Sequence, residues 1–110
     1  MFRSDERWML SEALPLIREL GPLVRELDYH LCLGGSVLLT GASDHDLDLW
    51  FIPLNGFESD PRKIYVLCEQ TFGPLKTLRD GPDYKAGEPW HLQDMQRATY
   101  LGKRIDLFIL

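Results

Sequence analysis

The chain has 110 residues, a length typical of a single domain, and 45% of them are hydrophobic while 26% are charged. This composition is that of an ordinary globular protein, and it excludes a disordered or collagen-like chain. The formal net charge of -5 excludes a general attraction of the whole chain to the phosphates of DNA or RNA.

Features that the sequence lacks indicate its cellular compartment. Its first seven residues contain no apolar run like that of a signal peptide, and nowhere do 18 apolar residues follow one another. Cys32 and Cys68 fit no metal-binding spacing and are too few for a disulfide framework. We therefore expect a protein of the reducing cytoplasm that neither spans a membrane nor is secreted.

Apolar residues recur at helical spacing from Ser4 to about Leu27, with Arg and Glu between them. Pro15 and the Gly21-Pro22 step are expected to break this helix into two or three short pieces. Residues 1–28 are thus predicted to be an N-terminal helical region on an α/β core of residues 29–110, all within one domain.

The core is predicted to begin with a buried strand over residues 29–33, which ends in two glycines. About one helical turn is expected over residues 36–40 before Gly41, and a second strand over residues 46–52 before Pro53. Asp60 as N-cap and Pro61 at the first helical position predict a helix that Gly73-Pro74 ends.

Residues 75–89 are expected to form one short strand and then a surface loop. Residues 90–100 allow a helix or a strand that enters a hairpin turn near Gly102-Lys103, and the hairpin is favoured. Residues 104–110 are predicted to be a strand in either case, with alternate side chains on opposite faces. The predicted fold class is α/β (α+β), with a mixed β-sheet flanked by helices.

Asp46 and Asp48 carry the strongest chemical signal. Two positions apart on a strand, their carboxylates project to the same side, and Trp50 continues that face. Carboxylates this close repel each other, so one takes up a proton unless a cation neutralises the pair. Mg²⁺ or Mn²⁺, with substrate phosphates completing the coordination shell, is the predicted partner.

Gly34, Gly35 and Ser36 suggest a phosphate-binding loop. Glycines allow backbone amides to approach phosphate oxygens, and the short helix that follows presents its N-terminus to negative charge. Ser36 adds a hydroxyl donor. Taken singly, a glycine pair is more often a plain turn, and a serine in the position of Ser36 is more often a helix N-cap.

Together these residues resemble the signature of the DNA polymerase beta-like nucleotidyltransferase superfamily. Gly35-Ser36 is followed by nine residues and then by Asp46-Leu47-Asp48-Leu49. Residues 41–44 are also similar to the small-residue loop that often precedes the acidic pair. The resemblance runs from about residue 31 to residue 110, and it implies a nucleotidyltransferase-like sheet.

The resemblance further implies a third carboxylate on a later strand, and Asp106, within Arg104-Ile105-Asp106-Leu107-Phe108, is the candidate. Asp46, Asp48 and Asp106 would then be catalytic residues that bind two metal ions. One ion would activate an acceptor hydroxyl and the other would hold the nucleoside triphosphate as pyrophosphate leaves.

The sequence ends four residues after Asp106, where many relatives have a further helical region that holds the base and the acceptor. Within this superfamily, the sequence therefore most resembles minimal nucleotidyltransferases such as those of toxin and antitoxin pairs. Acceptor recognition is then expected from the N-terminal helices, the loop of residues 75–89, another subunit or the acceptor itself. The acceptor is a hydroxyl of a protein, an RNA or a small molecule.

Other interpretations stay open. Lys103 and Arg104 are candidates for pairing with the triphosphate, although a solvated turn explains both equally well. Arg97 gives a weaker signal, and His45 is not assigned to the site. The alternative function is a non-catalytic binding module, antitoxin-like or inhibitor-like, that keeps the fold and acts on a partner protein.

Overall fold

The structure is a computed structural model that describes residues 7–54, 59–77 and 95–110. Its elements, in chain order, are β1 (Trp8–Met9), α1 (Leu10–Glu26), β2 (Tyr29–Gly34), α2 (Gly35–Thr40), β3 (Ala42–Ser43), β4 (Leu47–Pro53), α3 (Pro61–Phe72), β5 (Lys76–Thr77), β6 (Met95–Tyr100) and β7 (Lys103–Ile109).

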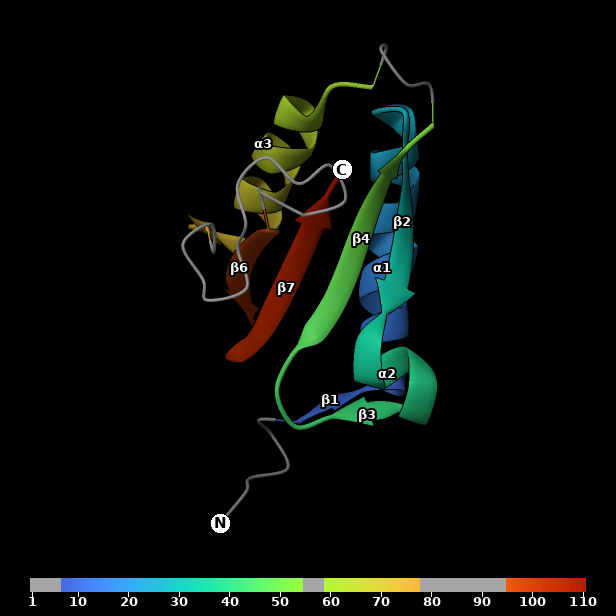
Figure 1. The fold of residues 1–110 in the computed structure, drawn as a ribbon, viewed down its shortest axis with the longest axis vertical. Helices are drawn as coiled ribbons and strands as arrows, with labels where there is room; N and C mark the ends of the chain where they lie inside the picture. Colours follow the sequence, from blue (N-terminus) through green and yellow to red (C-terminus); the bar gives the residue numbers. More distant parts are fainter. Residues whose placement is uncertain (1–6, 55–58, 78–94) are drawn as a thin grey trace, which may run out of the picture.

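Five strands form one mixed sheet in the order β2-β4-β7-β6-β5, while β1 and β3 pair separately. The β4 and β7 strands run parallel, and the other neighbouring pairs are antiparallel. Helix α1 packs along β2, and α3 packs against β6 and β7 (Figure 1). The predicted mixed sheet with flanking helices is therefore confirmed.

The prediction of a broken N-terminal helix is wrong, because α1 is one helix of 17 residues with Pro15 and Pro22 inside it. Both prolines are exposed, on the side of the helix away from the core, where water can hydrate the carbonyl groups that lose their partners. Each proline costs about 3 kcal/mol in a helix interior. Burial of Leu16, Leu20 and Val24, worth about 1.5–3 kcal/mol each, offsets that cost.

The predicted helix also begins too early. Trp8 and Met9 form β1, because their backbones pair with Ser43 and Ala42 of β3. The indole Nε1 of Trp8 donates a hydrogen bond to the carbonyl oxygen of Arg104 at 2.8 Å, and the Trp8 side chain is fully buried. Trp8 therefore joins the start of the chain to the start of β7.

The remaining predicted elements of the core are confirmed. The β2, α2 and β4 elements lie where the sequence places them, and α3 begins after Asp60, whose carboxylate accepts a hydrogen bond from the backbone N–H of Arg62 at 3.0 Å. Gly41, with φ of 83°, ends α2. The short strand expected after Leu75 is β5, whereas the predicted loop beyond Thr77 falls outside the described residues.

The preferred hairpin is confirmed for residues 95–109. Tyr100 pairs with Lys103, and both intervening residues, Leu101 and Gly102, have positive φ values of 56° and 77°. Such a two-residue turn matches the twist of antiparallel strands. Residues 90–94, part of the ambiguous segment, lie outside the described residues.

The core lies between the sheet and the two longer helices. Alternate residues of β4 and β7 are buried on this side: Leu47, Leu49 and Phe51, and Ile105, Leu107 and Ile109. The end of β2, helix α2 and the start of β4 lie together in the lower part of Figure 1. Among the described residues, no helix combines the length and the hydropathy that crossing a bilayer requires.

Candidate functional site

The three acids predicted from the sequence converge at one place. Asp46 immediately precedes β4, Asp48 lies on β4, and Asp106 lies on the adjacent parallel strand β7 directly beside Asp48. One carboxylate oxygen from each residue lies within 4.8 Å of those of the other two. The parallel register of β4 and β7 thus brings together residues that are about 60 positions apart in the chain.

Asp46 is held by the loop before β4. The buried hydroxyl of Ser43 accepts hydrogen bonds from the backbone N–H groups of His45 and Asp46, at 3.2 and 3.3 Å. Ser43 in turn pairs with Trp8 across the small β1–β3 sheet. A serine hydroxyl that bonds the following backbone stabilises a turn, so this loop places Asp46 at the acidic cluster. The side chain of His45 is exposed, and the cluster contains no atom of it.

The geometry raises the pKa of two of the acids. Burial, a side-chain hydrogen bond to Asp106 and the neighbouring negative charges raise the pKa of Asp46 to about 6, against a small opposing effect of Arg104. Burial and the charge of Asp106 likewise raise the pKa of Asp48, while Arg104 and Arg97 oppose the shift. A divalent cation would remove this repulsion, and three carboxylate oxygens suit a hard ion such as Mg²⁺ or Mn²⁺.

Two arginines contact the cluster in different ways. Arg97, on β6, donates from Nε and Nη2 to the two carboxylate oxygens of Asp106, at 2.7 and 3.2 Å. Arg104 approaches Asp46 through a single contact of 3.5 Å between Nη2 and Oδ2. The sequence marked Arg97 only weakly. The position of the hairpin turn at Leu101-Gly102 is the sequence feature that could have identified Arg97. Counting residues back from this turn places Arg97 opposite Asp106.

Gly34 and Gly35 allow the backbone of the loop to lie directly against Trp50 and Asp48. A Cβ atom on Gly35, whose φ is 66°, would lie 1.9 Å from the Oδ2 atom of Asp48. A Cβ atom on Gly34 would lie 2.8 Å from Nε1 of Trp50. Both positions therefore exclude a side chain, since the backbone of the loop runs directly against β4. Contact of these glycines with phosphate stays a prediction.

Ser36 and Lys103 differ in exposure. Ser36 is exposed at the start of α2, next to Gly35. Lys103 is buried; its ammonium group pairs with Glu12 of α1 and lies 5.2 Å from the ring centroid of Trp8. Lys103 thus takes part in the packing of the hairpin against α1, while Arg104 is exposed and contacts Asp46.

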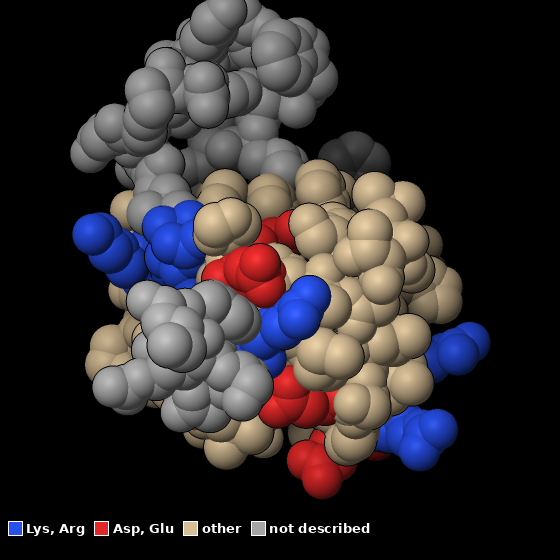
Figure 2. Space-filling model, turned by 90° about the horizontal axis from the view of Figure 1, so that it is seen from below, with Lys and Arg blue, Asp and Glu red and all other residues tan. Residues whose placement is uncertain are grey.

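Aromatic side chains continue the acidic face along the same two strands. Trp50 and Phe108 are register partners two residues beyond Asp48 and Asp106, and their rings stack with centroids 4.3 Å apart and planes within 9°. The prediction that Trp50 lies on the same side as the acids is confirmed. Seen from below, this end of the molecule shows acidic and basic side chains intermingled among other residues (Figure 2).

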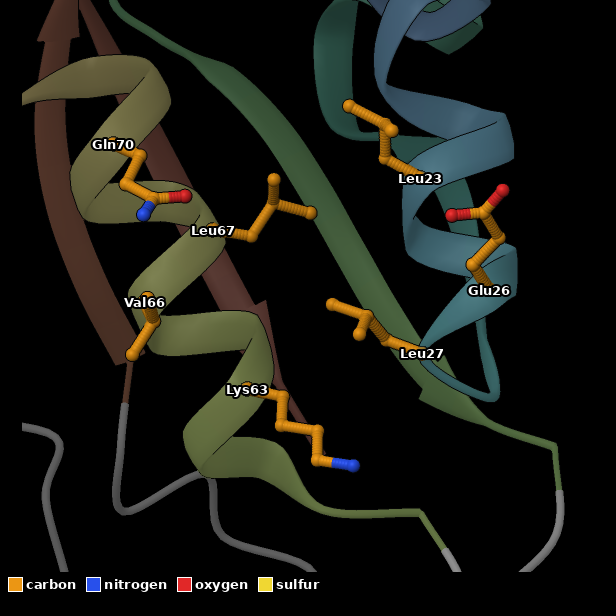
Figure 3. Close-up of a pocket in the computed structure, with 7 residues that line it drawn as sticks. All are labelled: Leu23, Glu26, Leu27, Lys63, Val66, Leu67 and Gln70. Atoms are coloured by element: carbon orange, nitrogen blue, oxygen red, sulfur yellow. The ribbon is translucent and has the colours of Figure 1, made fainter.

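A separate hollow lies on the helix side of the sheet, between α1 and α3 (Figure 3). Its cavity volume is about 380 Å³, and most of its lining is apolar. The lining residues are Leu23, Glu26, Leu27, Lys63, Val66, Leu67 and Gln70. None of the acids or glycines of the predicted site belongs to this hollow, which is therefore distinct from the acidic cluster.

Comparison of the chain with protein-family models, curated proteins and solved structures gives no significant match. The arrangement of Asp46, Asp48, Asp106 and the neighbouring glycines is therefore what carries the functional inference.

Proposed function

We propose that this protein is a nucleotidyltransferase dependent on Mg²⁺ or Mn²⁺, which moves a nucleoside monophosphate from a nucleoside triphosphate to a hydroxyl acceptor. The observation that supports this most is the convergence of Asp46, Asp48 and Asp106 within 4.8 Å. A cluster of three partly or fully buried carboxylates is unfavourable by itself, and it becomes favourable when a divalent cation neutralises it.

Each residue of the site has a role in this proposal. Asp46, Asp48 and Asp106 would hold the metal, which when bound supplies charge neutralisation for the triphosphate and for the developing oxyanion. Gly35 lies beside Asp48, and it would face the phosphates together with the exposed Ser36 that follows it. Arg104 is exposed next to Asp46, and among the described residues it is the cation that we propose attracts a triphosphate oxygen.

The acceptor of the nucleoside monophosphate is the part of the reaction that an experiment has to identify. We propose a hydroxyl group on a protein, an RNA or a small molecule. The net charge of -5 disfavours long nucleic acids as acceptors, because a chain of this charge repels a phosphate backbone.

An assay for transfer of a labelled nucleoside monophosphate to an acceptor tests the proposal. The protein is incubated with Mg²⁺, each α-labelled nucleoside triphosphate and cell extract, and labelled macromolecules and small molecules are then separated. We expect metal-dependent labelling that the double variant Asp46→Asn/Asp48→Asn abolishes. Circular dichroism would show that the double variant remains folded.

Asp60→Asn is the matched control. Asp60 is the N-cap of α3 and Asn caps helices about as well as Asp, so this change also removes a carboxylate while keeping the cap. It should label at the wild-type level. Full activity in the double variant would overturn the proposed function.

Calorimetry with Mg²⁺ and each nucleoside triphosphate separates the enzyme from a non-catalytic module. An enzyme of this type binds a triphosphate in the presence of metal, with an affinity that falls when Asp46 and Asp48 are replaced. Absence of any metal-dependent nucleotide binding by the wild-type protein would instead favour a partner-binding module that retains the fold.

A further inference from the structure

The third acid of the cluster differs from the other two in its partner. Arg97 meets both carboxylate oxygens of Asp106 through two nitrogen atoms, at 2.7 and 3.2 Å. The side chain of Asp106 is 5% exposed and that of Arg97 is 32% exposed. A two-point hydrogen bond between ions is both stronger and more directional than a single contact. Asp106 is therefore held in a buried, geometrically defined ion pair.

The backbone reinforces this pairing. Arg97 and Asp106 are opposite residues of the β6–β7 hairpin, whose register the Leu101-Gly102 turn sets. Opposite residues of an antiparallel pair have Cβ atoms about 4.5–5.5 Å apart, so a guanidinium group reaches the facing carboxylate easily. Arg97 is accordingly part of the sheet that carries the acids.

The arginine next to Asp46 provides the contrast. The contact from Arg104 to Asp46 is a single one of 3.5 Å, with the two side chains 41% and 23% exposed. Asp46 is thus only weakly paired with a cation, whereas both oxygens of Asp106 already have a cationic partner.

Charge balance then sets the number of metal ions. With Arg97 and Arg104 both counted, the three ionised carboxylates keep one net negative charge, which a single divalent ion is enough to match. A second divalent ion at Asp106 would compete with Arg97 for the same oxygen atoms, and the two cations would repel each other at short range.

We infer that Arg97 is a positioning residue that takes the place of a second metal ion at Asp106. The nucleotide-free protein then binds one divalent cation at the acidic cluster, with no second ion at Asp106. This inference rests on the proposed function, because it assumes that the acids form a metal site.

Counting bound Mn²⁺ tests the role of Arg97. Electron paramagnetic resonance detects free Mn²⁺ during a titration and so gives the number of ions bound per chain. We expect one ion for the wild-type protein. Arg97→Met should bind two, because the vacated Asp106 becomes available. Arg97→Lys, which keeps a positive charge beside Asp106, should bind one.

Arg104→Met is the matched control, since it also removes one positive charge next to an acid of the cluster. It should keep the count at one and tighten binding by about two- to fivefold, the effect expected for a partly exposed charge pair. Circular dichroism establishes that each variant is folded. The wild-type and Arg97→Lys counts test the inference even if Arg97→Met does not fold.

Two results would overturn the role of Arg97 while leaving the metal site in place: two Mn²⁺ ions bound to the wild-type protein, or a single ion bound to folded Arg97→Met. Absence of Mn²⁺ binding in the wild-type protein would contradict the proposed function itself. The two failures are therefore distinguishable.

Discussion

The two faces of strands β4 and β7 carry opposite kinds of side chain. On one face, Leu49 and Leu107 are fully buried beneath the helices. On the other face, one residue earlier on each strand, Asp48 and Asp106 meet in the acidic cluster. Because successive side chains of a strand point to opposite faces, one pair of strands builds both the core and the site.

Stability and site chemistry are therefore separable at adjacent positions of these strands. Residues on the core face stabilise the fold by burial of apolar surface. Asp46 and Asp48 on the acidic face have raised pKa values, so in the metal-free protein their charged forms oppose folding at neutral pH. Substitutions one residue apart should therefore act on different properties.

The largest expected effect comes from the core face. Leu49→Ala should lower the free energy of unfolding by about 2–5 kcal/mol, because it leaves a cavity at a fully buried position. Urea unfolding at pH 7 in the presence of a chelator measures this change. Against a total stability of about 5–15 kcal/mol, the loss is large.

Asp48→Asn, at the adjacent residue, is the control for Leu49→Ala. It should change the free energy of unfolding by less than about 1 kcal/mol in the metal-free protein, since it removes a carboxylate that burial and Asp106 disfavour. A loss of stability as large as that of Leu49→Ala would break the separation between the two faces.

A smaller effect is expected at the loop that faces the acids. Gly35→Ala introduces a Cβ atom 1.9 Å from the Oδ2 atom of Asp48, at a position whose φ of 66° disfavours side chains. The left-handed conformation alone costs about 1–2 kcal/mol. Mn²⁺ affinity should fall by about tenfold or more as Asp48 is displaced. Unfolding and Mn²⁺ titration measure both effects.

Gly21→Ala is the matched glycine control. Gly21 lies inside α1, and a Cβ atom there would meet nothing within 4 Å. Alanine should raise the free energy of unfolding by about 0.5–1 kcal/mol and leave Mn²⁺ affinity unchanged. Wild-type Mn²⁺ affinity in Gly35→Ala would show that the contact between the loop and Asp48 does not shape the site.

The smallest expected effect is a pH dependence of stability in the metal-free protein. The pKa of Asp46 is raised from 3.8 to about 6 in the folded state, so between these values the folded chain binds more protons than the unfolded one. The melting temperature should therefore rise as the pH is lowered from 7 towards 5.

Asp46→Asn isolates this contribution, because the amide group that replaces the carboxyl does not titrate. The difference in melting temperature between the wild-type protein and Asp46→Asn, followed against pH, should diminish as the pH falls below 6. A difference that does not change between pH 5 and pH 7 would contradict the raised pKa of Asp46.

Much of the local structure could be predicted from the sequence. The N-cap Asp60 with Pro61, the alternation in residues 104–110 and the glycines that end β2 are short-range signals, and α3, β7 and the loop before α2 follow from them. The unbroken helix α1 could not be predicted in this way. Its stability depends on burial against the sheet, which outweighs the unfavourable local preference of two prolines.

The roles of the basic residues around the site also could not be predicted from local sequence signals. Lys103 and Arg104 are adjacent in the sequence and equally plausible as triphosphate ligands, yet Lys103 pairs with Glu12 beneath Trp8 while Arg104 is exposed near Asp46. Strand alternation explains why they diverge, because neighbouring residues face opposite sides. Which side holds the acids depends on the register of β7 beside β4.

The residue types of the site, the same-side placement of Asp46 and Asp48, and the glycines at 34 and 35 can all be read from the sequence, which also names Asp106 as a candidate. Strand pairing is what brings Asp106 beside Asp48 and places Arg97 against Asp106. The physical reason is that a two-residue periodicity acts within one strand, whereas the pairing of β4 with β7, and of β7 with β6, is set by long-range burial and by the hairpin turn.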